Sequence, residues 1–168
     1  MSADVEVKKA LARAYRLLAV RPRSEEEVRH SLARSGFGEA AREEAITTLL
    51  AQGLLNDRSF ALEWTRSRVE SRPRSRRLIE RELKAKGVSS EDIEAATSEL
   101  DDDALALQVV SRRLRFVDNL DRQTCLRRLS QYLLSRGFTG ETVTRAVTAA
   151  LSSREDSKHE EEHDKLQR

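Results

Sequence analysis

The sequence predicts an all-α fold made of three tandem three-helix repeats, and three observations lead to that prediction. Ala, Leu, Arg and Glu dominate the composition, and all four residues favour helix. The tetrapeptide Arg-Pro-Arg-Ser occurs twice, at residues 21–24 and 72–75, an offset of 51 residues. A Leu-x-x-x-Gly-apolar pattern follows each copy and recurs a third time, 50 residues later. Units of about 50 residues lie within the range of helical repeat lengths.

Each tetrapeptide predicts the start of the middle helix of its repeat. Pro22 and Pro73 cannot continue a preceding helix, and each disfavours helical geometry in the arginine before it. Ser24 and Ser75 are then placed as N-caps, because a serine oxygen accepts hydrogen bonds from the unpaired N–H groups of a first turn. Glu27 stands three residues after Ser24, which is the spacing of a capping box.

A glycine predicts the end of each middle helix. Gly36, Gly87 and Gly137 suit the left-handed position that follows the last helical residue. Apolar residues four apart give each middle helix one buried stripe. These pairs are Val28 with Leu32, Ile79 with Leu83, and Leu129 with Leu133.

A further helix is expected on each side of every middle helix, which gives nine helices. In the first repeat the flanking apolar residues are Leu11, Tyr15 and Leu18 before it, and Ile46, Leu49 and Leu50 after it. In the second they are Phe60, Trp64 and Val69, and then Ile93 and Ala96. In the third they are Leu105, Val109 and Leu114, and then Val143, Val147 and Ala150. The third repeat is the least regular copy, because its first helix is shifted in register and Gln123 replaces proline.

These landmarks divide the chain into five segments. Residues 1–9 are expected to be a flexible N-terminus, and residues 10–56, 57–100 and 101–151 the three repeats. Residues 152–168 contain almost no apolar side chains and are expected to be a disordered charged tail. Apolar residues make up only 38% and charged residues 36% of the chain, a balance that favours thin, elongated helical units over one thick core.

The sequence points to a soluble protein that works in the cytoplasm. One cysteine, Cys125, excludes an internal disulfide and gives no spacing of metal ligands. The N-terminus lacks the apolar stretch of a signal peptide. No apolar run approaches the roughly 18 residues that a membrane span needs. We therefore expect no membrane partner.

Positive charge is concentrated in the second repeat, although the formal net charge of the chain is only +2. Residues 58–86 contain ten cations and four acids. On a helix, Arg77, Arg81 and Lys84 cluster on the face opposite Ile79 and Leu83. The acidic run at residues 89–103 follows, with seven acids and no cation, and a second basic group lies beyond it. A near-neutral total therefore hides strong local fields.

Most of these cations are arginines, which bind phosphate or carboxylate groups through two parallel hydrogen bonds. Contacts to backbone phosphates give salt-sensitive binding that tolerates any nucleic-acid sequence. The candidate recombinase- or DNA-binding residues are Arg66, Arg68, Arg72, Arg74, Arg76, Arg77, Arg81, Lys84, Lys86, Arg112, Arg113, Arg115, Arg127 and Arg128. The alternative for any one of them is a solvated helix face with ion pairs inside the chain.

Other residues that resemble functional sites are better explained otherwise. His159 and His163 have a spacing that could hold a metal, but they lie in the expected tail and lack a third ligand. Trp64 could stack on a base, yet packing against Phe60 is the preferred interpretation. No phosphate loop, nucleophile elbow or metal cluster is present. We predict no enzyme, no catalytic residue, no metal and no cofactor.

Three motifs that follow one another along the chain resemble those of the bacterial RecX family, whose members are regulators of the RecA recombinase. The first is carried by Asp57, Phe60, Ala61, Trp64 and Arg68, the second by Glu82, Leu83, Lys86 and Gly87, and the third by Arg136, Gly137 and Phe138. The resemblance covers about residues 10–151. Family members usually carry a glycine near the position of Ser75, and a serine there can also cap a helix.

The resemblance implies a curved, modular, all-helical protein that lies in the groove of the RecA filament on single-stranded DNA. There it would inhibit the ATPase, strand-exchange and coprotease activities of the recombinase. The implied partners are the RecA filament, single-stranded DNA and, more weakly, duplex DNA, and we expect a monomer. The family supplies no small set of contact residues, so the candidate residues above come from charge and geometry.

Two alternatives remain open at this point. Three-helix units can present a recognition helix to a major groove, so the chain could be a stand-alone DNA-binding protein. A specific operator with a large affinity ratio over random duplex would support that function. The array could also be a scaffold for an unrelated protein.

Overall fold

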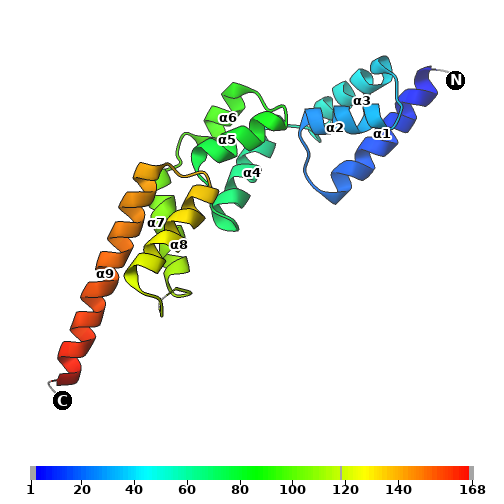
Figure 1. Ribbon diagram of the computed structural model, residues 1–168. Helices are drawn as coiled ribbons and strands as arrows, with labels where there is room; N and C mark the ends of the chain where they lie inside the picture. Colours follow the sequence, from blue (N-terminus) through cyan, green and yellow to red (C-terminus); the bar gives the residue numbers. More distant parts are fainter. Residues whose placement is uncertain (1–2, 118, 167–168) are drawn as a thin grey trace. The chain divides into compact units, whose positions relative to one another are not determined.

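Nine α-helices and no strand make up the part of the chain that the structure describes (Figure 1). The computed structural model describes the backbone of residues 3–117 and 119–166 and the side chains of residues 4–117 and 119–154. The helices are α1 (Ala3–Val20), α2 (Glu25–Arg34), α3 (Glu39–Ala51), α4 (Asp57–Glu70), α5 (Arg76–Ala85), α6 (Ser90–Thr97), α7 (Asp102–Leu114), α8 (Arg122–Ser135) and α9 (Gly140–Leu166). The predicted all-α architecture of three three-helix repeats is confirmed.

The middle helices α2 and α5 begin as the tetrapeptides predict. The side-chain oxygen of Ser24 accepts a hydrogen bond from the N–H of Glu27 at 3.2 Å, and the Glu27 carboxylate accepts one from the N–H of Ser24 at 3.3 Å. The predicted capping box is therefore present. At the start of α5, the Ser75 hydroxyl accepts a hydrogen bond from the N–H of Leu78 at 3.3 Å.

The glycines end the middle helices in the expected left-handed conformation. Their φ angles are +83° at Gly36, +77° at Gly87 and +87° at Gly137. After each glycine, the N–H of the next residue donates back to the carbonyl of the leucine five residues before it, as in a Schellman motif. The residues that fold back in this way are Phe37, Val88 and Phe138.

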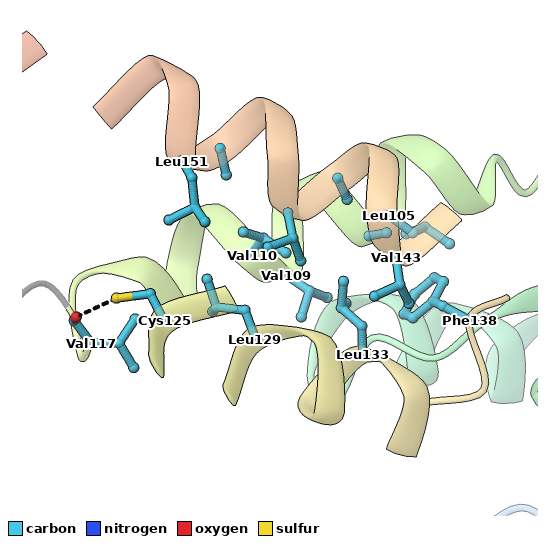
Figure 2. Packing of buried hydrophobic residues seen from close by; sticks show 14 residues of the cluster. Leu105, Val109, Val110, Val117, Cys125, Leu129, Leu133, Phe138, Val143 and Leu151 are labelled. Atoms are coloured by element: carbon cyan, nitrogen blue, oxygen red, sulfur yellow. Dashed lines mark hydrogen bonds between the residues drawn. The ribbon is translucent and has the colours of Figure 1, made fainter. Parts of the chain in front are cut away.

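The third repeat departs from the other two at the start of α8. This helix has 14 residues, whereas α2 and α5 have 10 each. Because Gln123 stands in place of proline, the helix extends upstream and is capped by Asp121, which accepts a hydrogen bond from the N–H of Thr124 at 2.9 Å. Cys125, at the position of Ser24 and Ser75, consequently lies inside the helix. Its buried thiol donates to the carbonyl of Val117 at 3.0 Å (Figure 2).

Both ends of the chain contain more helix than the sequence predicted. The segment expected to be a flexible N-terminus belongs to α1, where Glu6 accepts a hydrogen bond from the N–H of Gly38 at 2.7 Å. The glycine has no side chain to cap α3, so the Glu6 carboxylate takes that role. The segment expected to be a disordered tail continues α9 to Leu166. Its Glu, Lys and Arg residues have high helix propensity although they offer no apolar stripe.

The helices form two compact units, one from residues 1–67 and 80–98, the other from residues 68–79 and 99–168. The division passes through α5, so the middle repeat contributes to both units. In the first unit, Val28 and Leu32 of α2 are fully buried with Ala45 and Leu49 of α3.

The core of the second unit is formed by α7, α8 and α9. Figure 2 shows Leu129 and Leu133 of α8 facing side chains of the other two helices, among them Val109 of α7 and Val143 of α9. Each of these four side chains is at least nine-tenths buried. The apolar stripe predicted for the middle helix of the third repeat is therefore confirmed.

The boundary between the first and second repeats lies within the first unit and is held by the start of α2. The hydroxyl of Ser24 donates to the carbonyl of Lys86, just after α5, at 2.6 Å. The N–H of Glu25 donates to Oδ1 of Asp57, the first residue of α4, at 2.8 Å. A Cβ atom at Gly87 would lie 2.5 Å from Cβ of Glu26, so the two repeats approach closely only because residue 87 is glycine.

The boundary between the second and third repeats lies within the second unit and joins the equivalent residues, with the serine contributing its backbone N–H instead of its hydroxyl. The N–H of Ser75 donates to the carbonyl of Arg136 at 3.0 Å, and the N–H of Arg76 donates to Oδ1 of Asp102 at 2.7 Å. A Cβ atom at Gly137 would lie 2.7 Å from the Ser75 hydroxyl. Each tetrapeptide therefore serves as both a helix start and a docking point for the next repeat, and only the first role was predicted.

Candidate nucleic-acid interface

The predicted basic residues fall into three groups in the structure: one face of α5, an arginine cluster around the α4–α5 loop, and the surface of α7 and α8. On α5, Arg77, Arg81 and Lys84 are exposed, while Ile79 and Leu83 are fully buried. The predicted basic face is therefore present. The equivalent positions of α2, 51 residues earlier, carry Glu26, His30 and Ala33. The basic face is thus a property of the middle repeat and does not arise from the repeat pattern itself.

The arginine cluster in the second unit consists of Arg68 from α4, Arg72 and Arg74 from the α4–α5 loop, and Arg136 from the end of α8. Partial burial, and then the charges of Arg68, Arg136 and Arg72, lower the pKa of the Arg74 guanidinium. Like charges therefore lie close enough to repel one another. Because guanidinium groups bind phosphate oxygens through two parallel hydrogen bonds, the cluster is a candidate for a phosphate group.

Arg136 was absent from the residues proposed from the sequence. It follows the last turn of α8, and the folded chain brings it to arginines more than 60 residues earlier. Two sequence signals pointed to it: Arg136 belongs to the third family motif, and a basic residue, Lys86, also precedes the equivalent glycine of the second repeat.

Lys86 is engaged inside the first unit. Its ammonium group forms an ion pair with Glu27 at 2.8 Å and lies 4.2 Å from the centre of the Trp64 ring. The Trp64 indole N–H donates to the Glu82 carboxylate at 2.9 Å, and its ring centre lies 5.8 Å from that of Phe60. These contacts place Trp64 in the packing of the repeat, as the preferred interpretation expected, and give Lys86 a structural partner.

Glu27 is the centre of this ion-pair group. Burial opposes ionisation of its carboxyl group, but hydrogen bonds from Arg21 and Lys86 outweigh it and lower its pKa to about 2. The Arg21 guanidinium contacts both carboxylate oxygens, at 2.9 and 3.2 Å. The group therefore holds the first tetrapeptide against the second repeat by charge as well as by backbone hydrogen bonds.

Two other members of the predicted set also contribute to packing. Arg76 is partly buried and supplies the backbone N–H that binds Asp102, and Arg68 is partly buried in α4. Arg66 and Arg72 are exposed. The predicted set is thus a mixture of exposed cations and cations whose backbone or side chain also holds the fold.

The second basic group lies on the second unit, where α7 ends and α8 passes. The exposed residues here are Arg112, Arg113, Arg115, Arg127 and Arg128. The Arg113 guanidinium carbon lies 4.3 Å from the centre of the Tyr132 ring, and that of Arg136 lies 4.8 Å from it. Tyr132 therefore connects this group to the arginine cluster, a connection that no sequence pattern indicates.

The described side chains include no group of three or more His, Cys, Asp or Glu residues that could hold a metal ion. His159 and His163 lie outside the side chains that the structure describes. No helix among the described residues is long and apolar enough to cross a membrane. The described side chains do include exposed arginines and lysines, among them Arg77, Arg81 and Lys84.

Comparison with known proteins identifies the repeats. Models of the first, second and third three-helix domains of RecX match residues 10–49, 56–96 and 101–147. The chain belongs to the RecX family. The three matched segments coincide with the three structural repeats, so the repeats derived from the tetrapeptides and glycines are the domains of this family.

Individual relatives support the same assignment. The chain is 40% identical over 134 residues to a protein named regulatory protein RecX from Amycolatopsis mediterranei, a match that covers 78% of this chain and 77% of the relative. It is 36% identical over 157 residues to regulatory protein RecX from Streptomyces coelicolor, covering 91% and 84%. The crystal structure of RecX from Lactobacillus salivarius has the same fold, with a TM-score of 0.72 and 19% identity over 88% of this chain and 97% of the other.

Proposed function

We propose that this RecX-family protein binds the RecA filament on single-stranded DNA, in the filament groove, and inhibits its ATPase, strand-exchange and coprotease activities. The observation that carries the proposal is the positive surface of the middle repeat, presented by a chain with all three RecX domains. The proposed partners are the recombinase protomers and the phosphates of the strand, with weaker binding to duplex DNA and with the protein acting as a monomer.

The chemistry of the basic residues supports an extended partner. The α5 face and the arginine cluster consist almost entirely of arginines, which fit phosphate and carboxylate oxygens bidentately. Many modest contacts along repeated protomers add up to strong binding when the sites are linked in one chain.

The experiment that tests the proposal adds the purified chain, at substoichiometric ratios, to preformed RecA filaments and measures ATP hydrolysis. We expect the wild-type chain to inhibit hydrolysis. The triple variant Arg77→Glu, Arg81→Glu and Lys84→Glu should not inhibit, while its helical content by circular dichroism stays unchanged because all three residues are exposed.

A matched control reverses three exposed cations of α1, with Lys8→Glu, Lys9→Glu and Arg16→Glu. It changes the net charge by the same amount outside the proposed interface and should inhibit like the wild type. Equal inhibition by both triple variants would show that the α5 face is not the interface. A chain that leaves ATP hydrolysis untouched but binds one duplex sequence strongly would instead be a stand-alone DNA-binding protein.

The salt dependence of binding separates phosphate contacts from contacts to the recombinase. If the α5 face binds phosphates, the triple variant should lower the slope of log affinity against log salt concentration by about 1 for each contact removed. An unchanged slope with lost inhibition would assign the face to acidic surface of the recombinase.

A further inference from the structure

The end of α7, the loop after it and one side of α8 line a cavity of about 430 Å³ that is open to solvent, in the second unit. Ligand sites typically measure about 300–1,000 Å³. Two buried apolar residues, Val117 and Leu129, form part of its lining. The remaining lining residues are Arg113, Phe116, Arg128, Gln131, Tyr132 and Ser135. The lining therefore combines apolar surface, aromatic rings and cations, and contains no acid.

Phe116 is the most unusual member of this lining, because 71% of it is exposed to solvent. It directly precedes Val117, which is buried in the core of the same unit. The ring therefore projects from an anchored point of the chain into solvent beside the cavity. The guanidinium carbon of Arg115 lies 5.4 Å from the centre of the Phe116 ring, so the ring stands in a positive environment and keeps surface available for a flat partner.

Tyr132 forms the second aromatic side of the cavity. The Arg113 guanidinium lies against its ring, and Arg136 donates a hydrogen bond to its hydroxyl at 2.8 Å. These contacts fix the ring and hold the Arg113 guanidinium beside it. A planar guanidinium packed in this way offers its outer surface for stacking.

Charge identifies the partner of this surface. The helix α8, residues 122–135, contains no Asp or Glu. Among the described residues, neither Arg113, Arg115 nor Arg128 forms an ion pair with a carboxylate. A ligand that stacks on the exposed aromatic rings and also pairs with these arginines needs both flat faces and negative charge. A nucleobase attached to its phosphate has both.

We propose that this cavity is a nucleobase-stacking site for single-stranded nucleic acid. An unpaired base stacks on Phe116 and the Arg113 guanidinium, the Gln131 amide reaches the polar edge of the base, and Arg128 binds the adjoining phosphate. Aromatic side chains beside a basic groove are the general means by which single strands are bound without sequence preference. The contrast with Trp64 supports this assignment, since Lys86 covers the Trp64 ring inside the first unit.

This proposal deepens the proposed function, because the strand is the one on which the recombinase assembles, but its test needs no recombinase. The full chain is titrated into two labelled oligomers of about 16 nucleotides, which is long enough for known single-strand sites. One is oligothymidine, and the other is the same sugar-phosphate chain without bases. Fluorescence anisotropy at low salt gives the two dissociation constants.

We expect the wild-type chain to bind oligothymidine about tenfold more tightly than the abasic oligomer, within the range measured for base–aromatic stacking. Phe116→Ala should lose this preference by weakening binding to oligothymidine alone, and Phe116→Leu should behave in the same way because it keeps apolar bulk without a ring. Phe116→Trp should keep the preference. The matched control is Leu134→Ala on α8, which removes an apolar side chain that is 53% exposed and lies outside the cavity lining.

A second measurement does not depend on any variant. Photo-crosslinking of a bromouridine oligomer to the wild-type chain, followed by peptide mapping, should identify Phe116 or Tyr132. Crosslinks only elsewhere, equal affinity for the two oligomers, or no binding of oligothymidine would each overturn the proposal. Binding to acidic peptides with no response to bases would assign the cavity to a protein partner. Inhibition of RecA is read in the separate ATPase assay, so either proposal can fail alone.

Discussion

The two repeat boundaries bring equivalent residues together but differ in the atoms and side chains that join them. At both, a tetrapeptide serine contacts the carbonyl before a left-handed glycine, and an Asp at the start of the next repeat accepts an N–H from the middle helix. At the first, Glu27 adds ion pairs to Arg21 and Lys86. At the second, Leu78 occupies the position of Glu27. The serine, glycine and aspartate positions are therefore the repeated unit of assembly. The serine contributes its hydroxyl at the first boundary and its backbone N–H at the second, and ion pairs are an addition at the first.

The largest effect should come from adding a methyl group at the boundary glycines. An alanine at positive φ costs about 1–2 kcal/mol, which is all we expect for Gly36→Ala, because nothing lies within 4 Å of its Cβ position. Gly87→Ala and Gly137→Ala must also move a neighbouring repeat, so we expect a loss of about 3 kcal/mol in the free energy of unfolding for each.

Urea denaturation measures these losses in all three glycine variants. Fluorescence of Trp64, the only tryptophan, reports on the first boundary, and hydrogen exchange of α7–α9 reports on the second. Gly36→Ala is the matched control for backbone strain. Equal losses in the three variants would mean that the close approach of the repeats contributes nothing.

Serine removal should distinguish the two boundaries. The Ser24 hydroxyl both donates to Lys86 and accepts from Glu27, so Ser24→Ala should cost about 2 kcal/mol. Ser75 reaches Arg136 through its backbone N–H, which alanine retains. Ser75→Ala should therefore cost only the capping contribution of about 1 kcal/mol. Thermal unfolding measures both, with the exposed Ser59→Ala as control, and a larger loss at Ser75 would contradict this order.

Acid should weaken the first boundary through Glu27. Its pKa is lowered from 4.5 to about 2, so its stabilising contribution is complete above pH 4.5 and is lost as the pH falls through about 2. Glu27→Gln should cost about 1–2 kcal/mol at neutral pH, allowing for solvent screening, and should remove this pH dependence. Urea denaturation followed by Trp64 fluorescence across this pH range is the measurement, and Glu63→Gln at an exposed position is the control. A pH dependence that survives in Glu27→Gln would locate its origin elsewhere.

The smallest effect should come from the two boundary aspartates. Burial raises the pKa of Asp57 and of Asp102, and the backbone N–H that each accepts offsets this only in part. Because the pKa of each aspartate is raised in the folded state, each carboxyl group stabilises the fold fully only at a pH below its ordinary pKa of 3.8. This stabilisation is lost as the pH rises through the raised pKa of the folded state. Asp57→Asn and Asp102→Asn keep an acceptor without the charge, so stability at pH 7 should rise by less than about 1 kcal/mol. A clear loss of thermal stability in either variant would show that the negative charge itself is required.

The helices were predictable because their signals are local. Prolines, capping serines and glycines act on the backbone within a few residues, and Val28 with Leu32 marks a buried face through spacing alone. The ends of the chain were less predictable. The N-terminal segment joins α1, where Glu6 caps a helix 32 residues away, and no local pattern identifies that partner.

The candidate interface was predictable in composition but not in arrangement. The spacing of Arg77, Arg81 and Lys84 correctly predicted an exposed basic face, because a single helix sets their relative positions. It could not show that Lys86 is engaged with Glu27, that Arg136 joins the cluster around Arg74, or that Phe116 remains exposed. Those outcomes depend on contacts between segments distant in the sequence.

The sequence by itself therefore determined the number of repeats, the start and end of each middle helix, and the surplus of arginine in the second repeat. These properties follow from backbone conformational preference and helical periodicity, which act over one or two turns. Tertiary structure alone decided which serine and aspartate join neighbouring repeats, which cations pair internally, and which aromatic ring faces solvent. Those features depend on distances between segments far apart in the chain, and such distances exist only after the helices have packed.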